Sequence, residues 1–220
     1  MPTFGFSAFL KLLSLNPRPQ RREVRVRLSP STGGYDFHRS LRLKSARLMI
    51  DGEELQALID EASDLGNPAE RRSLEAGLRQ LDAWRVANPG QVLAVQSALY
   101  VSPSEEFKIS FLPDFGYRLG GQTLAVHVWN TATVPLSARM TYAALALVSA
   151  AYTDGSAPDD VAVLSLPDNR LLRLSDVPDQ RELAANVANN LDRLFVSVRE
   201  DILGSIEPPD IRPGGSPGIL

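Results

Sequence analysis

Residues 113–131, PDFGYRLGGQTLAVHVWNT, hold the side chains with the clearest chemical potential in this chain of 220 residues. Asp114 ends an apolar segment, and His127 lies within the buried-looking strand LAVHVW after a double-glycine turn. Carboxylate oxygens and imidazole nitrogens both bind divalent metals. Magnesium-dependent cleavage of a phosphodiester would also need an acid, one spacer and a lysine in the second strand. Here those positions hold His127, Val128 and Trp129.

Ordinary roles compete with the chemical ones at these positions. Asp114 follows a proline, and aspartate is a good turn residue in that context. A histidine in an apolar strand, such as His127, is more often a hydrogen-bonded core residue than a ligand. Lys108 lies on the strand that leads to Asp114, and it replaces the missing lysine only if it points inward at the same edge. Metal chemistry and core packing both stay open.

A basic block occupies residues 17–47. Nine basic and two acidic residues give it a charge of +7, which leaves −10 for the rest of a chain whose net charge is −3. Such a block favours a polyanion such as nucleic acid. The candidate phosphate contacts are Arg18, Arg21, Arg22, Arg25, Arg27, Arg39 and Arg42. The alternative is a solvated face that pairs with acidic helices of the same protein.

Composition excludes several classes of site. The chain has no cysteine, which rules out disulfides, zinc–cysteine sites and cysteine-ligated iron–sulfur clusters and fits a reducing, cytoplasmic location. No run of about 18 apolar residues is present, so no membrane span is expected. The apolar segment near the N-terminus lacks the flanks of a signal peptide, so we expect it to be an amphipathic helix.

Periodicity predicts the elements that would position these residues. Helices are predicted over residues 6–15, 53–65, 68–87, 135–152 and 178–203. Strands are predicted over residues 23–28, 92–101, 107–112, 122–130, 161–166 and 170–174. Residues 35–50 fit a helix or a strand. The order predicts a mixed α/β fold with a central mixed sheet flanked by helices.

The elements divide into three parts. Residues 1–90 form a helical, basic segment that should pack on the core, and residues 91–204 form the α/β core. Residues 205–220 are rich in proline and glycine, and we predict a flexible tail or docking arm there.

Several motifs in this order carry a family resemblance. FSAFLKLLSLNPR supplies an opening helix, GGYDFH supplies a G-x-x-x-H spacing through Gly34 and His38, and DAWRVANPG precedes the first core strand. PLSARMTYAALAL supplies a helix that keeps Tyr142 of a Q-x-x-x-Y motif but has Ala138 in place of glutamine. Together they resemble the RecB-like branch of the PD-(D/E)XK nuclease superfamily over roughly residues 4–175, which implies a restriction-endonuclease-like core.

The resemblance implies a metal site, but the chain departs from its pattern. Asp114 matches the metal-binding aspartate, and His38 is the further candidate ligand. A shifted register places Val128 and Asn130 at the positions of the second acid and the lysine, so neither register supplies them. We therefore expect no cofactor, and Mg²⁺ or Mn²⁺ only if residual activity exists.

Three functions remain open at this point. The first is a catalytically degenerate nuclease-fold protein that binds nucleic acid or serves as a scaffold subunit, in defence or recombination by resemblance. The second is a residual metal-dependent nuclease that uses His38, Asp114 and His127, with Lys108 displaced; two imidazoles and a carboxylate suit manganese or iron. The third is a protein-interaction module, with protein partners and no nucleic acid.

Overall fold

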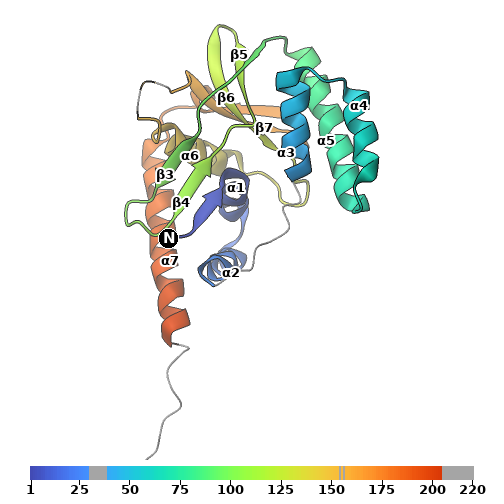
Figure 1. Ribbon diagram of the computed structural model, residues 1–220. Coiled ribbons are helices and arrows are strands. Elements are labelled where there is room, and N and C mark those ends of the chain that lie inside the picture. Colours follow the sequence, from blue (N-terminus) through green and yellow to red (C-terminus); the bar gives the residue numbers. More distant parts are fainter. Residues whose placement is uncertain (30–38, 154, 156, 205–220) are drawn as a thin grey trace, which may run out of the picture.

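The computed structural model describes residues 1–29, 39–153, 155 and 157–204 (Figure 1). Its strands are β1 (Thr3–Gly5), β2 (Gln91–Leu93), β3 (Ala98–Val101), β4 (Lys108–Phe111), β5 (Phe115–Leu119), β6 (Gln122–Trp129), β7 (Asp160–Ser165) and β8 (Arg170–Arg173). Its α-helices are α1 (Phe6–Ser14), α2 (Pro17–Leu28), α3 (Arg39–Ala46), α4 (Leu55–Asp60), α5 (Pro68–Ala87), α6 (Ala138–Ser149) and α7 (Arg181–Gly204). The mixed α/β fold is as predicted. The predicted 205–220 tail lies outside the described residues.

Two sheets organise these strands. A five-stranded sheet has the order β2-β5-β6-β7-β8, and only the β6–β7 pair within it is parallel. Helix α6 connects β6 to β7, as a parallel crossover requires. A three-stranded sheet has the order β1-β4-β3, in which β1 pairs with β4 in parallel.

Strand β6 separates two hydrophobic clusters because successive side chains point to opposite faces of a sheet. Leu124, Val126 and Val128 face one cluster, which also contains the buried side chains of α3, α4 and α5. Ala125 and Trp129 face the other cluster, which contains those of α1, α6, α7 and the three-stranded sheet. This burial on both faces explains why the strand reads as nearly continuous apolar sequence.

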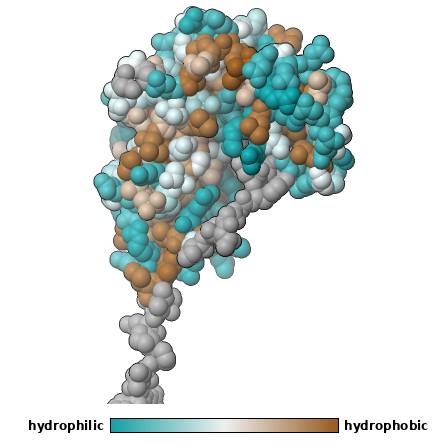
Figure 2. Space-filling view, in the orientation of Figure 1, coloured by the Kyte–Doolittle hydropathy of each residue, from teal (hydrophilic) through white to brown (hydrophobic). Residues whose placement is uncertain are grey.

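The helix predicted over residues 68–87 is confirmed as α5, and its start has a clear cause. The side chain of Asn67 accepts the backbone N–H groups of Ala69 and Glu70, and Pro68 occupies the first helical position. The ambiguous segment before it is helical where described: α3 continues into a π-helix, η1 (Arg47–Asp51). The 3₁₀-helix η2 (Glu61–Asp64) extends α4. On the face of the molecule shown in Figure 2, hydrophilic residues predominate over α3–α5.

The strand predicted over residues 23–28 is wrong, because this segment is the second half of α2. The sequence PRPQRREVRVRL alternates arginine with valine and leucine, but only Val24 is buried, and Val26 is 56% exposed. A helix places Val24 and Leu28 on one face, which packs against α7. A strand would have placed Val26 on that face as well.

One further strand prediction needs correction, and two strands were missed. The segment predicted as one strand over residues 92–101 is two short strands, β2 and β3, in different sheets. Strands β1 and β5 were not predicted. Strand β5 has the sequence FGYRL, and its Phe115, Gly116 and Tyr117 are buried.

The hairpin predicted over residues 161–174 is confirmed as β7 and β8, which the short 3₁₀-helix η3 (Leu174–Asp176) follows. The predicted boundary near residue 90 falls between α5 and β2, but described residues on its two sides share both hydrophobic clusters. The long helix α7 packs on α2 and α6. Among the described residues, no helix has the length and apolar character needed to cross a membrane.

Candidate functional site

Strands β5 and β6 bring Asp114 and His127 together. Asp114 immediately precedes β5, and its N–H donates to the carbonyl oxygen of Val126 at 2.8 Å. The register pairs Phe115 with Val126, so the next pair along is Asp114 and His127. Both side chains leave the sheet on the same face, because directly opposed residues of an antiparallel pair share a face.

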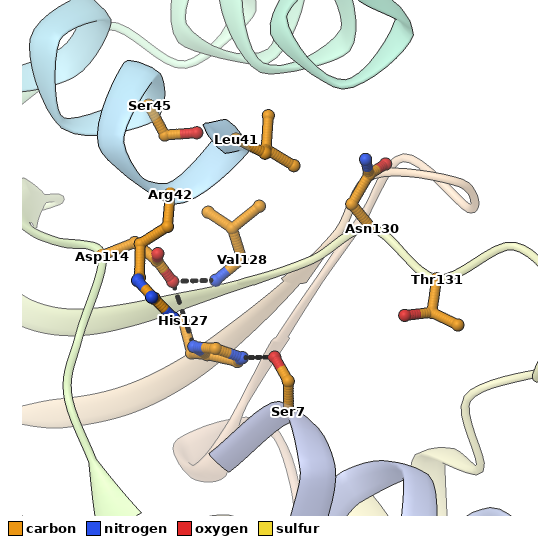
Figure 3. Close-up of a pocket in the computed structure, with 9 residues that line it drawn as sticks. All are labelled: Ser7, Leu41, Arg42, Ser45, Asp114, His127, Val128, Asn130 and Thr131. Atoms are coloured by element: carbon orange, nitrogen blue, oxygen red, sulfur yellow. Dashed lines mark hydrogen bonds and ion pairs between the residues drawn. The ribbon is translucent and has the colours of Figure 1, made fainter. Parts of the chain in front are cut away.

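His127 is the centre of a chain of three polar side chains (Figure 3). Its Nε2 lies 2.7 Å from the Oγ of Ser7, which comes from the first turn of α1. Its Nδ1 lies 3.0 Å from Oδ2 of Asp114. That second contact is short, but its geometry is not that of a hydrogen bond, and Nδ1 has no hydrogen-bond partner among the described residues. The imidazole therefore lies between a hydroxyl and a carboxylate.

Asp114 also completes the backbone pairing of β6. Its Oδ2 accepts the N–H of Val128 at 2.7 Å, at the point where β5 has not yet begun. The carboxylate thus replaces a strand carbonyl for one residue, and the Asp114 side chain is only 4% exposed. A buried carboxylate requires such partners.

Aromatic packing fixes the plane of the imidazole. The Phe6 ring meets the His127 ring edge-on, with centroids 5.2 Å apart, and meets the Phe111 ring in the same way at 4.8 Å. Phe6, Phe9 and Leu10 bury one face of α1, which leaves Ser7 turned toward β6. The contact with Phe6 therefore restricts the rotamer of His127.

A small cavity of about 30 Å³ lies over these residues, between α1 and α3. Its lining residues are Ser7, Leu41, Arg42, Ser45, Asp114, His127, Val128, Asn130 and Thr131. In Figure 3, Arg42 extends from α3 toward Asp114 and His127. The Oγ of Ser45 is buried there without a hydrogen bond among the described residues. A cavity of this size holds on the order of one water molecule.

In both registers, the position where a nuclease of this type would carry its lysine holds a structural residue. Trp129 is 2% exposed and belongs to the hydrophobic cluster around α6. Asn130, at the lysine position of the shifted register, donates to the carbonyl oxygen and the hydroxyl of Ser73 on α5. Tyr142 packs partly buried against the same cluster as Trp129.

Lys108 and His38 are not brought to this site by the described structure. Lys108 opens β4, where it pairs with Thr3 and Val101, whereas Asp114 follows the other end of that strand. His38 and Gly34 lie outside the described residues. Asp114 and His127 are thus the two predicted site residues that the structure places in contact.

The candidate arginines of α2 divide into two groups. Arg21 and Arg25 share Asp201 of α7, at 2.5 and 3.4 Å. The guanidinium of Arg27 lies 5.1 Å from the centroid of the Phe4 ring. Arg18 and Arg22 are exposed and make no ion pair within the described part of the chain.

The basic residues of the next segment also differ. Arg39 and Arg42 are exposed on α3. Arg47 instead pairs with Glu53 and Glu61, and Lys44 with Glu61. These hydrogen bonds lower the pKa of Glu61 to about 2, chiefly through Arg47. The alternative of internal pairing therefore holds for part of the basic block.

Asp114 and His127 offer few of the oxygen ligands that a magnesium ion prefers. Across residues 1–29, 39–153 and 157–204, no group of three or more His, Asp and Glu side chains could hold a metal. Asp114 uses Oδ2 on Val128 and His127, and His127 uses Nε2 on Ser7. Magnesium prefers several oxygen ligands in an octahedron, and this pair offers one carboxylate.

Ser7 is the residue that sequence reasoning missed. It lies 120 positions before His127. Its signal was weak but present: it is a polar residue in the first turn of the apolar helix FSAFLKLLS, on no predicted core face.

Comparison with models of known protein families and with curated proteins found no match to this chain.

Proposed function

We propose that this protein binds nucleic acid on a nuclease-like α/β core that lacks the metal chemistry of such enzymes. The observation that carries the proposal is the outer face of α2. Arg18 and Arg22 lie there one turn apart, exposed and without an ion pair among the described residues. Arg25 follows on the same face and contacts Asp201, while Val24 is buried in the core. A rigid helix therefore presents a row of guanidinium groups that suit successive phosphates.

The arrangement of the core supports the same proposal. Asp114 and His127 come from neighbouring strands at one edge of the sheet. The resemblance to RecB-like nucleases implies metal ligands at that edge. Each is bound to the protein itself, and Trp129 fills the expected lysine position with a core side chain. These differences from the nuclease pattern support binding without metal-dependent cleavage. A cytoplasmic location is part of the proposal.

A salt titration tests the binding. Affinity for short single- and double-stranded DNA and RNA is measured by fluorescence anisotropy between about 50 and 200 mM salt. Each arginine that contacts a phosphate of duplex DNA contributes about 0.9 to the slope of log K against log salt. The double variant Arg18→Gln/Arg22→Gln should lose about 1.8 from that slope.

The matched control removes the same charge from another helix. Arg72 and Arg79 are exposed on α5 and make no ion pair among the described residues. The variant Arg72→Gln/Arg79→Gln should keep the slope of the unaltered protein. Absence of binding at 50 mM salt to every nucleic acid, or equal effects of the two double variants, contradicts the proposal.

A cleavage assay tests the catalytic half. Labelled DNA and RNA are incubated with the protein and millimolar Mg²⁺ or Mn²⁺, and we expect intact substrate. Cleavage that is lost in Asp114→Ala would show that the metal chemistry is retained and would overturn this half alone.

A further inference from the structure

The contacts of His127 match those of a general base that activates a serine. A serine nucleophile requires a hydroxyl within about 2.6–3.2 Å of an imidazole nitrogen, and a third group that orients the ring. Ser7 Oγ lies 2.7 Å from Nε2, and Asp114 Oδ2 lies 3.0 Å from Nδ1 on the other side of the ring. The hydroxyl and the imidazole are thus hydrogen-bonded, and the carboxylate lies beside the imidazole without a hydrogen bond of good geometry to Nδ1.

The surroundings keep this order fixed. The edge-on contact with Phe6 holds the imidazole plane, and the N–H of Val128 holds the carboxylate. General-base catalysis requires the tautomer with hydrogen on Nδ1, in which Nε2 is free to accept the Ser7 proton. Ser7 is half-buried and His127 is 7% exposed, so solvent competes weakly for either group.

We propose that Ser7 is a nucleophile for acyl transfer, with His127 as its general base, and that the site hydrolyses esters of small carboxylic acids. This activity is separate from nucleic-acid binding and does not depend on it. The small cavity beside Ser7, about 30 Å³, favours the smallest acyl groups, with the leaving group directed outward.

The reaction balances with water as the co-reactant. Ser7 Oγ bonds to the ester carbonyl carbon as its proton passes to Nε2 of His127. The carbon–oxygen bond to the leaving alcohol then breaks, and that alcohol takes the proton from Nε2. Water repeats the sequence on the acyl-serine, which releases the acid and restores Ser7. The N–H groups of the first turn of α1 have no side-chain cap, and we assign them to the oxyanion.

The first experiment measures acylation of Ser7. The full chain is mixed with p-nitrophenyl acetate and quenched in acid, and the acetyl group is located by peptide mass spectrometry. We expect acetylation at Ser7 that falls by about 10²–10⁴-fold in His127→Gln, because general-base catalysis contributes about that much. Circular dichroism confirms that each variant is folded. A folded, unaltered protein without acetyl-Ser7, or an equal rate in His127→Gln, overturns the proposal.

A second experiment tests the activation of position 7 without an ester, so its result does not depend on whether an ester fits the cavity. The chain has no cysteine, so Ser7→Cys and Ser14→Cys each carry a single thiol. Ser14 is the matched control, since it lies on the same helix, is also half-buried, and bonds to the Leu10 carbonyl oxygen. With iodoacetamide near neutral pH, the Ser7→Cys protein should react at least tenfold faster than Ser14→Cys. Equal rates would overturn the activation of position 7 by His127.

Asp114 acts in this scheme as a positioning residue. In Asp114→Asn, we expect the limiting rate of Ser7 acetylation to fall while the ester concentration that gives half that rate stays unchanged. A change in the half-saturating concentration alone would contradict a role in orienting the imidazole.

Discussion

Asp114 provides the sharpest test of how the site is built, because its Oδ2 is the acceptor for the Val128 N–H of β6. Asp114→Ala leaves that N–H unpaired in a buried strand, which costs about 1–3 kcal/mol. It also removes the carboxylate contact with His127. We expect a total loss near 3 kcal/mol in the free energy of unfolding.

Asp114→Asn separates the two effects. The amide oxygen still accepts the Val128 N–H, but the bond is no longer charge-assisted, so the expected loss is about 1 kcal/mol. With an m-value of about 3 kcal/mol per M of urea, the midpoint should fall by about 1 M for Asp114→Ala and about 0.3 M for Asp114→Asn.

Urea unfolding followed by circular dichroism measures both shifts. Asp64→Ala is the control, because Asp64 is exposed, and it should change stability by less than about 0.5 kcal/mol. Equal midpoints for Asp114→Ala and Asp114→Asn would refute the assignment of the loss to the Val128 hydrogen bond. A midpoint for Asp114→Ala equal to that of the control would refute any structural role.

Three further outcomes follow from packing and charge. Gly116→Ala should lower the free energy of unfolding by more than about 2 kcal/mol, because a Cβ there would lie 2.5 Å from a β2 carbonyl oxygen. A thermal melt measures this loss, and Gly66→Ala is the control because the space around Gly66 is open. Phe107→Ala should cost about 3–5 kcal/mol in urea unfolding, because this fully buried ring stacks between two other rings; a loss under 1 kcal/mol would contradict that packing. The contacts with Arg47 lower the pKa of Glu61 from 4.5 to about 2, so their stabilising contribution is full above about pH 4.5 and is lost as the pH falls toward 2. Stability measured across that range should depend less on pH in Glu61→Gln, and an unchanged pH profile would contradict the pairing.

The elements that sequence predicted well are those with local causes. The start of α5 follows from Asn67 and Pro68, whose effects need no distant residue. The buried strand β6 follows from its apolar run between a double glycine and a polar segment. Helix α2 was mistaken for a strand in its second half because RREVRVRL satisfies an alternating pattern. Its helical state is selected by packing on α7, more than 150 residues away.

The same distinction applies to the site. Asp114 and His127 were named as candidates for one site, because Asp114 follows one predicted strand and His127 lies within the next, but their contact required the fold. Ser7 was not foreseen, since its contact with His127 depends on how α1 packs beside the sheet. The partners of the arginines also required the fold, because Asp201 lies far along the chain from Arg21.

The parallel pairing of β1 with β4 has a consequence for how the chain folds. Thr3 lies beside Lys108, so this pairing closes a loop of roughly a hundred residues, and the entropy of that closure is lost before the contact is gained. The first turn of α1, which carries Ser7, is continuous with β1. During synthesis, the Ser7–His127 contact must wait until β6 has emerged from the ribosome. We therefore expect residues 3–14 to acquire protection from hydrogen exchange late in refolding, after the helices α3–α5 have formed their local contacts.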